Sequence, residues 1–256
     1  MKNFCFTVDD NIIFLKELTR GSYGSIFEHP YLAMYLRLHQ KYDLKIQLNL
    51  FYEDGEFALC EMTDRFACEW RDCSDWLKLS FHSRLENERP YLESGYDEVF
   101  EDCAAVHREI LRFASKESLA RTTTVHYCRA THEGLAALAA GGVCGLLGLY
   151  GNAEKPRGSY QSTPEECELL RSGATVHSGG IAYGAIDVIM NAHSKERILE
   201  KLDALMDREH INVMIHEQFF YPDYPRYQSD FEQKISAAFE RLSVGGYVSV
   251  FFEDII

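Results

Sequence analysis

The chain has 256 residues, 46% of them hydrophobic, so it is long and apolar enough to bury a sizeable core. Its formal net charge of −14 argues against a nucleic-acid partner, because phosphates need a basic face, and against anionic membrane surfaces. A neutral or cationic substrate, or a divalent metal ion, suits this charge better.

The eight cysteines are spread along the chain and form no Cys-x-x-Cys pair, which argues against a zinc ribbon and favours free thiols. The N-terminus has no basic segment leading into a long apolar run, so no signal peptide is expected. No apolar run reaches the roughly 18 residues that a membrane span needs. We therefore expect a soluble, cytoplasmic protein, and the sequence leaves its oligomeric state open.

The first predicted strand covers residues 4–8 and runs into two adjacent carboxylates, Asp9 and Asp10, followed by Asn11. In α/β folds the carboxyl ends of parallel strands carry the chemistry. Neighbouring carboxylates repel each other and lose solvation, so they persist mainly with a cation, a shared proton or good donors. The alternative at this point is an Asx-type turn that caps the next helix.

Strand and helix patterns alternate along the rest of the chain. We predict further strands at residues 45–52, 76–81, 122–125, 143–150, 183–189, 212–215 and 247–252. We predict helices at residues 12–18, 25–42 (after Pro30), 96–113, 134–140, 194–209 and 229–242. Residues 151–180 form an excursion from the main fold, with a hairpin around 172–181. The alternation predicts an α/β fold with a parallel sheet or barrel, in one domain covering residues 1–256.

Four of the predicted strands end in groups that can bind a metal or move a proton. These groups are Asp9 with Asp10, His82, His126, and His216 with Glu217. Because all strands of a parallel barrel end on the same face, the four ends would converge. Carboxylate and imidazole ligands suit zinc, iron, cobalt or manganese, and three protein ligands leave a position open for water. A single histidine at a strand end more often has a structural role. The prediction of a site therefore depends on finding such groups at four strand ends at once.

Three tyrosines follow His216 in a loop that contains prolines. They are Tyr221, Tyr224 and Tyr227. Their rings could present flat faces to a sugar ring or pack over the barrel mouth, and the sequence leaves both interpretations open.

The order of these motifs resembles that of the polysaccharide deacetylase family, within the wider glycoside hydrolase/deacetylase superfamily. The family opens with a strand ending in TFDDG, and residues 6–11 here read FTVDDN. Its second motif, H-S/T-x-x-H, is matched by HSRLE at residues 82–86, and its last, a strand ending in L-x-H, by MIH at residues 214–216. Its third motif starts with arginine, where this chain has HYCR at residues 126–129. The resemblance spans nearly the whole chain in motif order and marks a divergent branch with insertions at 53–75 and 151–180.

The resemblance implies a distorted (β/α) barrel of about seven parallel strands. Asp10 and His82 would bind a divalent metal, zinc by preference, with iron, cobalt, nickel or manganese as alternatives. Asp9 would be the general base and His216 the general acid.

The third metal ligand is open between two residues. Glu86 replaces the second histidine of the family's second motif, whereas His126 stands where the family has arginine. We favour His126, because an imidazole at a strand end is held more rigidly than a carboxylate in a charged stretch.

The function predicted in this way is metal-assisted removal of an N-acyl group, such as acetyl, from an amino sugar or related small saccharide. Glu217 would support catalysis by raising the pKa of its neighbour His216. One alternative is a glycoside hydrolase that uses Asp9 and Glu217 as a carboxylate pair. Another is a barrel that binds carbohydrate without turnover. The sequence does not identify the sugar, the acyl group or the metal.

Overall fold

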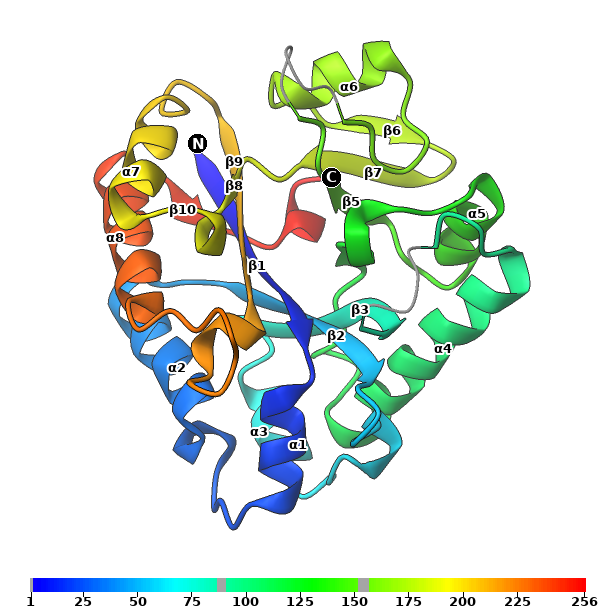
Figure 1. Cartoon of the computed structure of the whole chain (residues 1–256), viewed down its shortest axis with the longest axis vertical. Coiled ribbons are helices and arrows are strands. Elements are labelled where there is room, and N and C mark those ends of the chain that lie inside the picture. The colour runs from blue at the N-terminus through cyan, green and yellow to red at the C-terminus, as the bar shows by residue number, and fades with distance from the viewer. Residues whose placement is uncertain (1, 87–90, 152–156) are drawn as a thin grey trace.

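Parallel strands form the centre of the fold, and helices surround them (Figure 1). The computed structural model describes residues 2–86, 91–151 and 157–256. The strands are assigned to two sheets. The larger has the order β3-β2-β1-β9-β8, with β10 also paired to β1, and the smaller has the order β4-β5-β7-β6. The hairpin of β6 and β7 is antiparallel, and the other strand pairs are parallel.

The strands have the following bounds. In the larger sheet they are β1 (Asn3–Asn11), β2 (Ile46–Glu53), β3 (Leu77–Leu85), β8 (Val188–Ile189), β9 (His210–His216) and β10 (Val248–Ser249). In the smaller sheet they are β4 (Thr122–Thr123), β5 (Gly145–Gly148), β6 (Val176–Ser178) and β7 (Ile181–Ala185).

Backbone hydrogen bonds link the two sheets on both sides. Leu79 of β3 exchanges two of them with residues 118–120, just before β4. On the other side the chain runs from β7 into β8, where Ile186 donates to β5 and Asp187 donates to β9. The parallel strands thus surround the core in the order β1, β2, β3, β4, β5, β7–β8 and β9. Among the described residues, no continuous ladder of hydrogen bonds closes the ring. The predicted distorted barrel is confirmed in this form.

The helices are α1 (Ile13–Arg20), α2 (Pro30–Tyr42), α3 (Ala67–Asp72), α4 (Tyr96–Phe113), α5 (His132–Ala140), α6 (Pro164–Arg171), α7 (Lys195–Asp203) and α8 (Phe231–Val244). A side-chain hydrogen bond caps the start of α2, α5, α6 and α7 among the described helices. The prediction missed α3 and α6. For α6 a signal was present, because Thr163 caps its start, Pro164 takes the first helical position and Glu166 completes a capping box.

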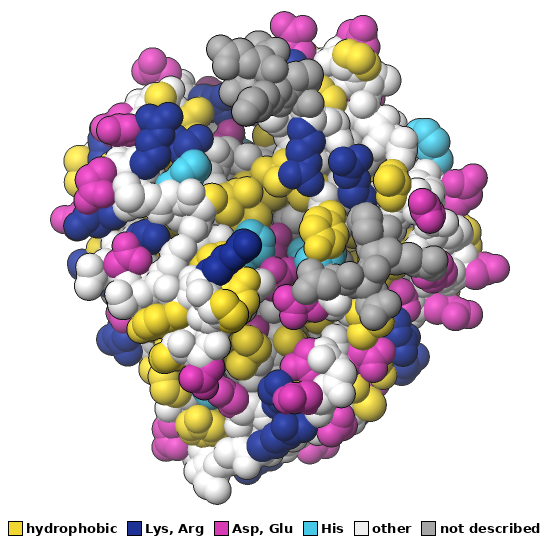
Figure 2. Space-filling model, in the orientation of Figure 1, with side chains coloured by type: hydrophobic (Ala, Val, Ile, Leu, Met, Phe, Trp, Pro, Cys, Tyr) yellow, Lys and Arg dark blue, Asp and Glu magenta, His cyan; other side chains and the backbone are white. Residues whose placement is uncertain are grey.

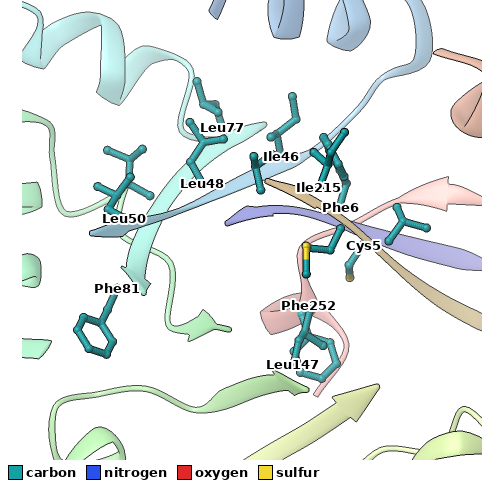
Figure 3. Packing of buried hydrophobic residues seen from close by; sticks show 14 of the residues in the cluster. Cys5, Phe6, Ile46, Leu48, Leu50, Leu77, Phe81, Leu147, Ile215 and Phe252 are labelled. Atoms are coloured by element: carbon teal, nitrogen blue, oxygen red, sulfur yellow. The ribbon is translucent and has the colours of Figure 1, made fainter. Parts of the chain in front are cut away.

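The core holds β1 in place. Phe6 packs edge-on against Phe239 of α8, with ring centroids 4.9 Å apart, and also contacts Tyr35 of α2. Apolar residues of β2, β3 and β9 pack beside β1 (Figure 3). Each such side chain contributes about 1.5–3 kcal/mol when it is fully buried. The end of β1, which carries Asp9 and Asp10, is therefore rigidly anchored.

Some predicted bounds differ from the structure. β3 continues to Leu85, because it pairs with β2 as far as Glu53, so His82 lies inside the strand rather than after it. The helix predicted at 194–209 ends at Asp203, where turns replace it. The hairpin predicted around 172–181 is formed by β6 and β7. Residues 152–156 of the predicted excursion lie outside the described residues.

All eight cysteines are free, as their spread along the chain indicated. Within the described ranges, no helix combines the length and the apolar character needed to cross a bilayer.

Candidate active site

The predicted site residues converge on one pocket of about 450 Å³ at the carboxyl ends of the strands. Figure 2 shows histidine and acidic side chains close together at a hollow near the centre of this face. Of the residues singled out from the sequence, those that line the pocket are Asp9, Asp10, His82, Glu86, His126 and His216. The separate strand ends thus lie together at one pocket, as expected. Glu217 does not line this pocket.

Asp9 and Asp10 face the same pocket, although successive side chains of a strand normally point to opposite faces. The backbone explains this. Asp10 has a φ of 63°, and the pairing of β1 with β2 shifts register between Val8 and Asn11. This left-handed conformation costs about 1–2 kcal/mol in a residue with a Cβ. The amide of Asn11 fixes the turn by donating to the carbonyl oxygens of Val8 (2.6 Å) and Asn49 (3.0 Å).

Asp10, His82 and His126 form a buried cluster of possible metal ligands. Asp10 Oδ1 lies 3.0 Å from His82 Nε2 and 3.3 Å from His126 Nδ1, and these two nitrogens are 3.1 Å apart. All three ligand atoms lie within 4.8 Å of one another. Three tetrahedral ligands at about 2.0–2.2 Å from a metal are about 3.3–3.6 Å apart, so a small opening of the cluster would fit one.

The chemistry of the donor set also fits a cation. His82 Nδ1 contacts the carbonyl oxygen of Thr124, an acceptor, so this nitrogen carries the proton of the neutral ring. His82 Nε2 then presents its lone pair to a carboxylate oxygen of Asp10. Two acceptors at 3.0 Å need a proton or a cation between them. A carbonyl that orients a histidine ring in this way is a common support for metal ligands.

His126 reaches the cluster from a short 3-10 turn after β4. The next two residues, Tyr127 and Cys128, both have positive φ values, of 58° and 55°, and their turn carries the chain away from the site. The imidazole packs edge-on against Phe51, and its buried Nε2 has no hydrogen-bond partner among the residues that the structure describes. Glu86 is exposed at the pocket wall and lies outside the cluster. The structure thus brings His126 to Asp10, and its role as third ligand stays a prediction.

The two carboxylates of β1 have opposite pKa shifts. Burial alone would raise the pKa of Asp10, but the imidazoles of His126, His82 and His216 outweigh burial and hold that pKa well below its usual range. This favours the ionised form of Asp10, which is the form in which a carboxylate binds a metal.

Burial, followed by repulsion from Asp10, raises the pKa of Asp9 well above its usual range. The side chain of Asn49 opposes this shift by donating to Asp9 Oδ1 at 2.7 Å. A carboxylate with a raised pKa binds protons more strongly, which suits a general base.

His216 lies opposite Asp9, because the two residues are direct partners in the ladder between β1 and β9. Its Nε2 lies 4.0 Å from Asp10 Oδ2, and its Nδ1 lies 2.9 Å from Asn191 Oδ1. Burial lowers the pKa of His216, and the charge of Asp10 opposes this shift. Asp9 and His216 thus stand side by side on the neighbouring strands β1 and β9.

Glu217 has a different position from the one expected. Its buried carboxylate accepts hydrogen bonds from the backbone N–H groups of Ile12, Ile13 and Phe14, at 2.7, 2.9 and 2.7 Å. These groups form the start of α1, where a carboxylate satisfies free donors and meets the helix dipole. Burial raises the pKa of Glu217 to about 7. The sequence predicted a catalytic role for Glu217. We instead assign Glu217 to the support of α1. The alternative glycoside hydrolase, which would pair Asp9 with Glu217, thereby loses one of its two carboxylates.

Sequence reasoning missed three amide side chains at the site. Asn49 holds Asp9, Asn191 holds His216, and Gln218 Nε2 donates to Asp10 Oδ2 at 2.7 Å. Asn49 lies between Leu48 and Leu50 in β2, and its amide is buried there together with that of Gln47.

The three tyrosines of the loop lie in different places, and a role in sugar binding stays a prediction. Tyr224 lines the candidate active site. Tyr221 instead packs against Tyr31 and donates to Glu217 Oε1, and Tyr227 lines a separate pocket.

No protein-family model matches the sequence, and no curated protein matches it significantly. Solved structures share its fold. A family 4 acetyl xylan esterase from Clostridium thermocellum, in complex with a cobalt ion, is 11% identical with a TM-score of 0.54, and the match covers 99% of this chain and 89% of that one. A peptidoglycan N-acetylglucosamine deacetylase is 9% identical with a TM-score of 0.50, at 99% and 87% coverage.

A 4-α-glucanotransferase from Thermococcus litoralis is 12% identical with a TM-score of 0.57, and the match covers 99% of this chain but only 40% of that one. The structural neighbours thus include an acetyl xylan esterase, a peptidoglycan deacetylase and a 4-α-glucanotransferase. At these identities the likeness establishes the fold alone. The chain has the distorted (β/α) barrel of the polysaccharide deacetylases.

Proposed function

We propose that this protein is a metal-dependent hydrolase that removes an N-acyl group, such as acetyl, from an amino sugar or related small saccharide. One observation carries the proposal: Asp10, His82 and His126 converge in a pocket that also holds Asp9 and His216. The carbohydrate deacetylases among the structural neighbours support the substrate class.

Asp10, His82 and His126 would hold the divalent metal, zinc by preference, with iron, cobalt, nickel or manganese as alternatives. Such a metal lowers the pKa of a water molecule toward about 7 and polarises a carbonyl group. Gln218 and the Thr124 carbonyl would orient the ligands, since they contact Asp10 and His82 respectively.

Asp9 would take a proton from water as the water oxygen bonds to the acyl carbon. When the C–N bond breaks, His216 would pass the proton on its Nε2 to the departing amine. The products are a free carboxylic acid and a free amine. Because Asn191 Oδ1 accepts from Nδ1, this donation requires the doubly protonated ring of His216.

The test is elemental analysis of the purified protein beside the variants Asp10→Ala and His82→Ala. We expect about one equivalent of a transition metal in the wild type and its loss in both variants. His177→Ala serves as the matched control, because His177 is an exposed histidine outside the pocket. The absence of bound metal after reconstitution would overturn the mechanism.

Turnover needs a second measurement, the release of acetate from N-acetylglucosamine. We expect Asp9→Asn to retain the metal and to lose this activity. A protein that binds metal but releases no acyl group from any N-acylated sugar would instead be a binding protein.

A further inference from the structure

A second pocket, of about 560 Å³, adjoins the candidate active site. Leu149, directly after β5, and Ile189, at the end of β8, line both pockets. The two hollows therefore share part of their wall. Figure 2 shows a hollow beside the histidines with basic side chains on both sides of it. A ligand held at the candidate metal site could extend into this second pocket.

The walls of the second pocket are basic, although the whole chain has a net charge of −14. Arg171 at the end of α6, Lys201 in α7 and Arg208 contribute three cations, against one carboxylate, Asp187, among the described lining residues. Arg208 is neutralised by Asp187, because Arg208 Nη1 lies 2.5 Å from Asp187 Oδ1. Arg208 Nη2 also donates to the carbonyl oxygen of Arg171 at 2.6 Å, which links the two arginines in one wall.

Arg171 and Lys201 remain as uncompensated charges. Neither forms an ion pair within 4 Å in the part of the chain that the structure describes, and both are half-buried. Arg171 Nη1 donates to the carbonyl oxygen of Tyr150 at 3.2 Å, and within the described ranges its guanidinium has no second hydrogen-bond acceptor. His193 lines the same pocket, and its pKa is lowered by burial and then by neighbouring cations, Lys201 first among them. The pocket therefore has a positive local field.

We propose that this second pocket binds a negatively charged group, a phosphate or a carboxylate, on the saccharide whose acyl group is removed at the adjoining site. The inference rests on the proposed function and names the class of its substrate. A bound anion would compensate the positive charges of Arg171 and Lys201, which line the same pocket. Arg171 would supply paired N–H donors and Lys201 a point charge.

This proposal revises the expectation drawn from the net charge, which favoured a neutral or cationic substrate. The acidic residues that set the net charge are distributed over the whole chain, whereas a bound substrate meets the local field of its pocket. Arg157 and Arg226, which line the candidate active site, extend the same basic character toward the metal ligands.

The experiment is calorimetric titration of the full chain, carrying Asp9→Asn to prevent turnover, with three sugars. N-acetylglucosamine is neutral, N-acetylglucosamine 6-phosphate carries a phosphate, and N-acetylmuramic acid carries a carboxylate. We expect at least one of the anionic sugars to bind about tenfold or more tightly than the neutral one, with a preference that weakens as salt is added. The two anionic sugars distinguish a phosphate from a carboxylate ligand.

In the same background, Arg171→Gln and Lys201→Gln should each remove most of this preference while leaving the affinity for the neutral sugar within about twofold, and Arg171→Lys should restore part of it. Lys195→Gln is the matched control, because Lys195 is exposed in α7, outside the pocket, and its loss changes the net charge equally. Equal affinities for all three sugars, or an equal effect of Lys195→Gln, would overturn the proposal.

Acetate release by the wild type separates this proposal from the proposed function. If anionic sugars bind through Arg171 and Lys201 but no acetate is released, the anion site stands and the hydrolase function fails. If neutral and anionic sugars are deacetylated equally well and Arg171→Gln has no effect, the function stands and the anion site fails.

Discussion

Asn191 Oδ1 accepts two hydrogen bonds from His216, one from the backbone N–H at 3.2 Å and one from ring Nδ1 at 2.9 Å. Because a backbone N–H can only donate, the Asn191 atom must be the oxygen, and Nδ1 of His216 must carry a proton. The remaining nitrogen, Nε2, faces Asp10. Asn191 thereby fixes both the orientation and the tautomer of His216, yet as a neutral amide it does not stabilise the imidazolium form with a charge.

Replacing this amide with a carboxylate should shift the pH dependence of turnover. The general acid must be protonated, so activity falls as the pH rises through the pKa of His216. The pKa of His216 is lowered by burial in the native protein, and the charge of a carboxylate in Asn191→Asp should raise this pKa. The alkaline limb of kcat/KM should therefore move to higher pH. If the variant is folded and loaded with metal but the alkaline limb of its pH profile does not shift, His216 is not the general acid.

The raised pKa of Asp9 should appear in the stability of the metal-free protein. A carboxyl group whose folded pKa lies above its unfolded value of about 3.9 stabilises the fold at low pH, and this contribution is lost as the pH rises through the folded pKa. Asp9→Asn removes the titrating group and its repulsion with Asp10. The chelated variant should therefore be more stable than the chelated wild type at pH 8, with a smaller difference at pH 4. Urea unfolding at both pH values measures this, and equal pH dependence would contradict it.

Glu217→Gln should reduce stability and leave chemistry largely intact. The substitution removes a buried carboxylate that accepts three backbone N–H groups at the start of α1, which should lower the free energy of unfolding by about 1–3 kcal/mol. Because this carboxylate lies outside the pocket, kcat should stay within about threefold of the wild type. Glu165→Gln, at an exposed helix start, is the control. A large loss of kcat without a loss of stability would return Glu217 to the catalytic groups.

Most of the fold could be predicted, because the spacing of apolar residues indicates which face of a strand or helix is buried. The run at residues 4–8 became the buried middle of β1, and the amphipathic pattern at residues 96–113 became α4 with the same bounds. Short elements in charged insertions were harder. α3 is six residues long, too short for a helical period to stand out from its polar surroundings.

The site was predictable at the level of which residues meet, but not in the direction of each side chain. The side chain of Asp10 points into the pocket because the residue has a positive φ, which the sequence does not predict. The side chain of Glu217 points away from the pocket because it accepts three backbone hydrogen bonds at the start of α1. The net charge was also a poor guide to the charge of the substrate. The basic wall formed by Arg171 and Lys201 depends on how α6 and α7 are placed in space, which the net charge does not show.

The choice between His126 and Glu86 as third ligand can be decided by metal affinity. His126 Nδ1 lies 3.3 Å from Asp10 Oδ1, whereas Glu86 lies at the exposed wall of the pocket. We expect His126→Ala to weaken metal binding by at least about a hundredfold, because it removes one of three ligands. Glu86→Ala should change it by less than about threefold, as expected of a side chain outside the ligand shell. Competition with a coloured chelator measures both, and retention of metal by His126→Ala together with its loss in Glu86→Ala would assign the third position to the carboxylate.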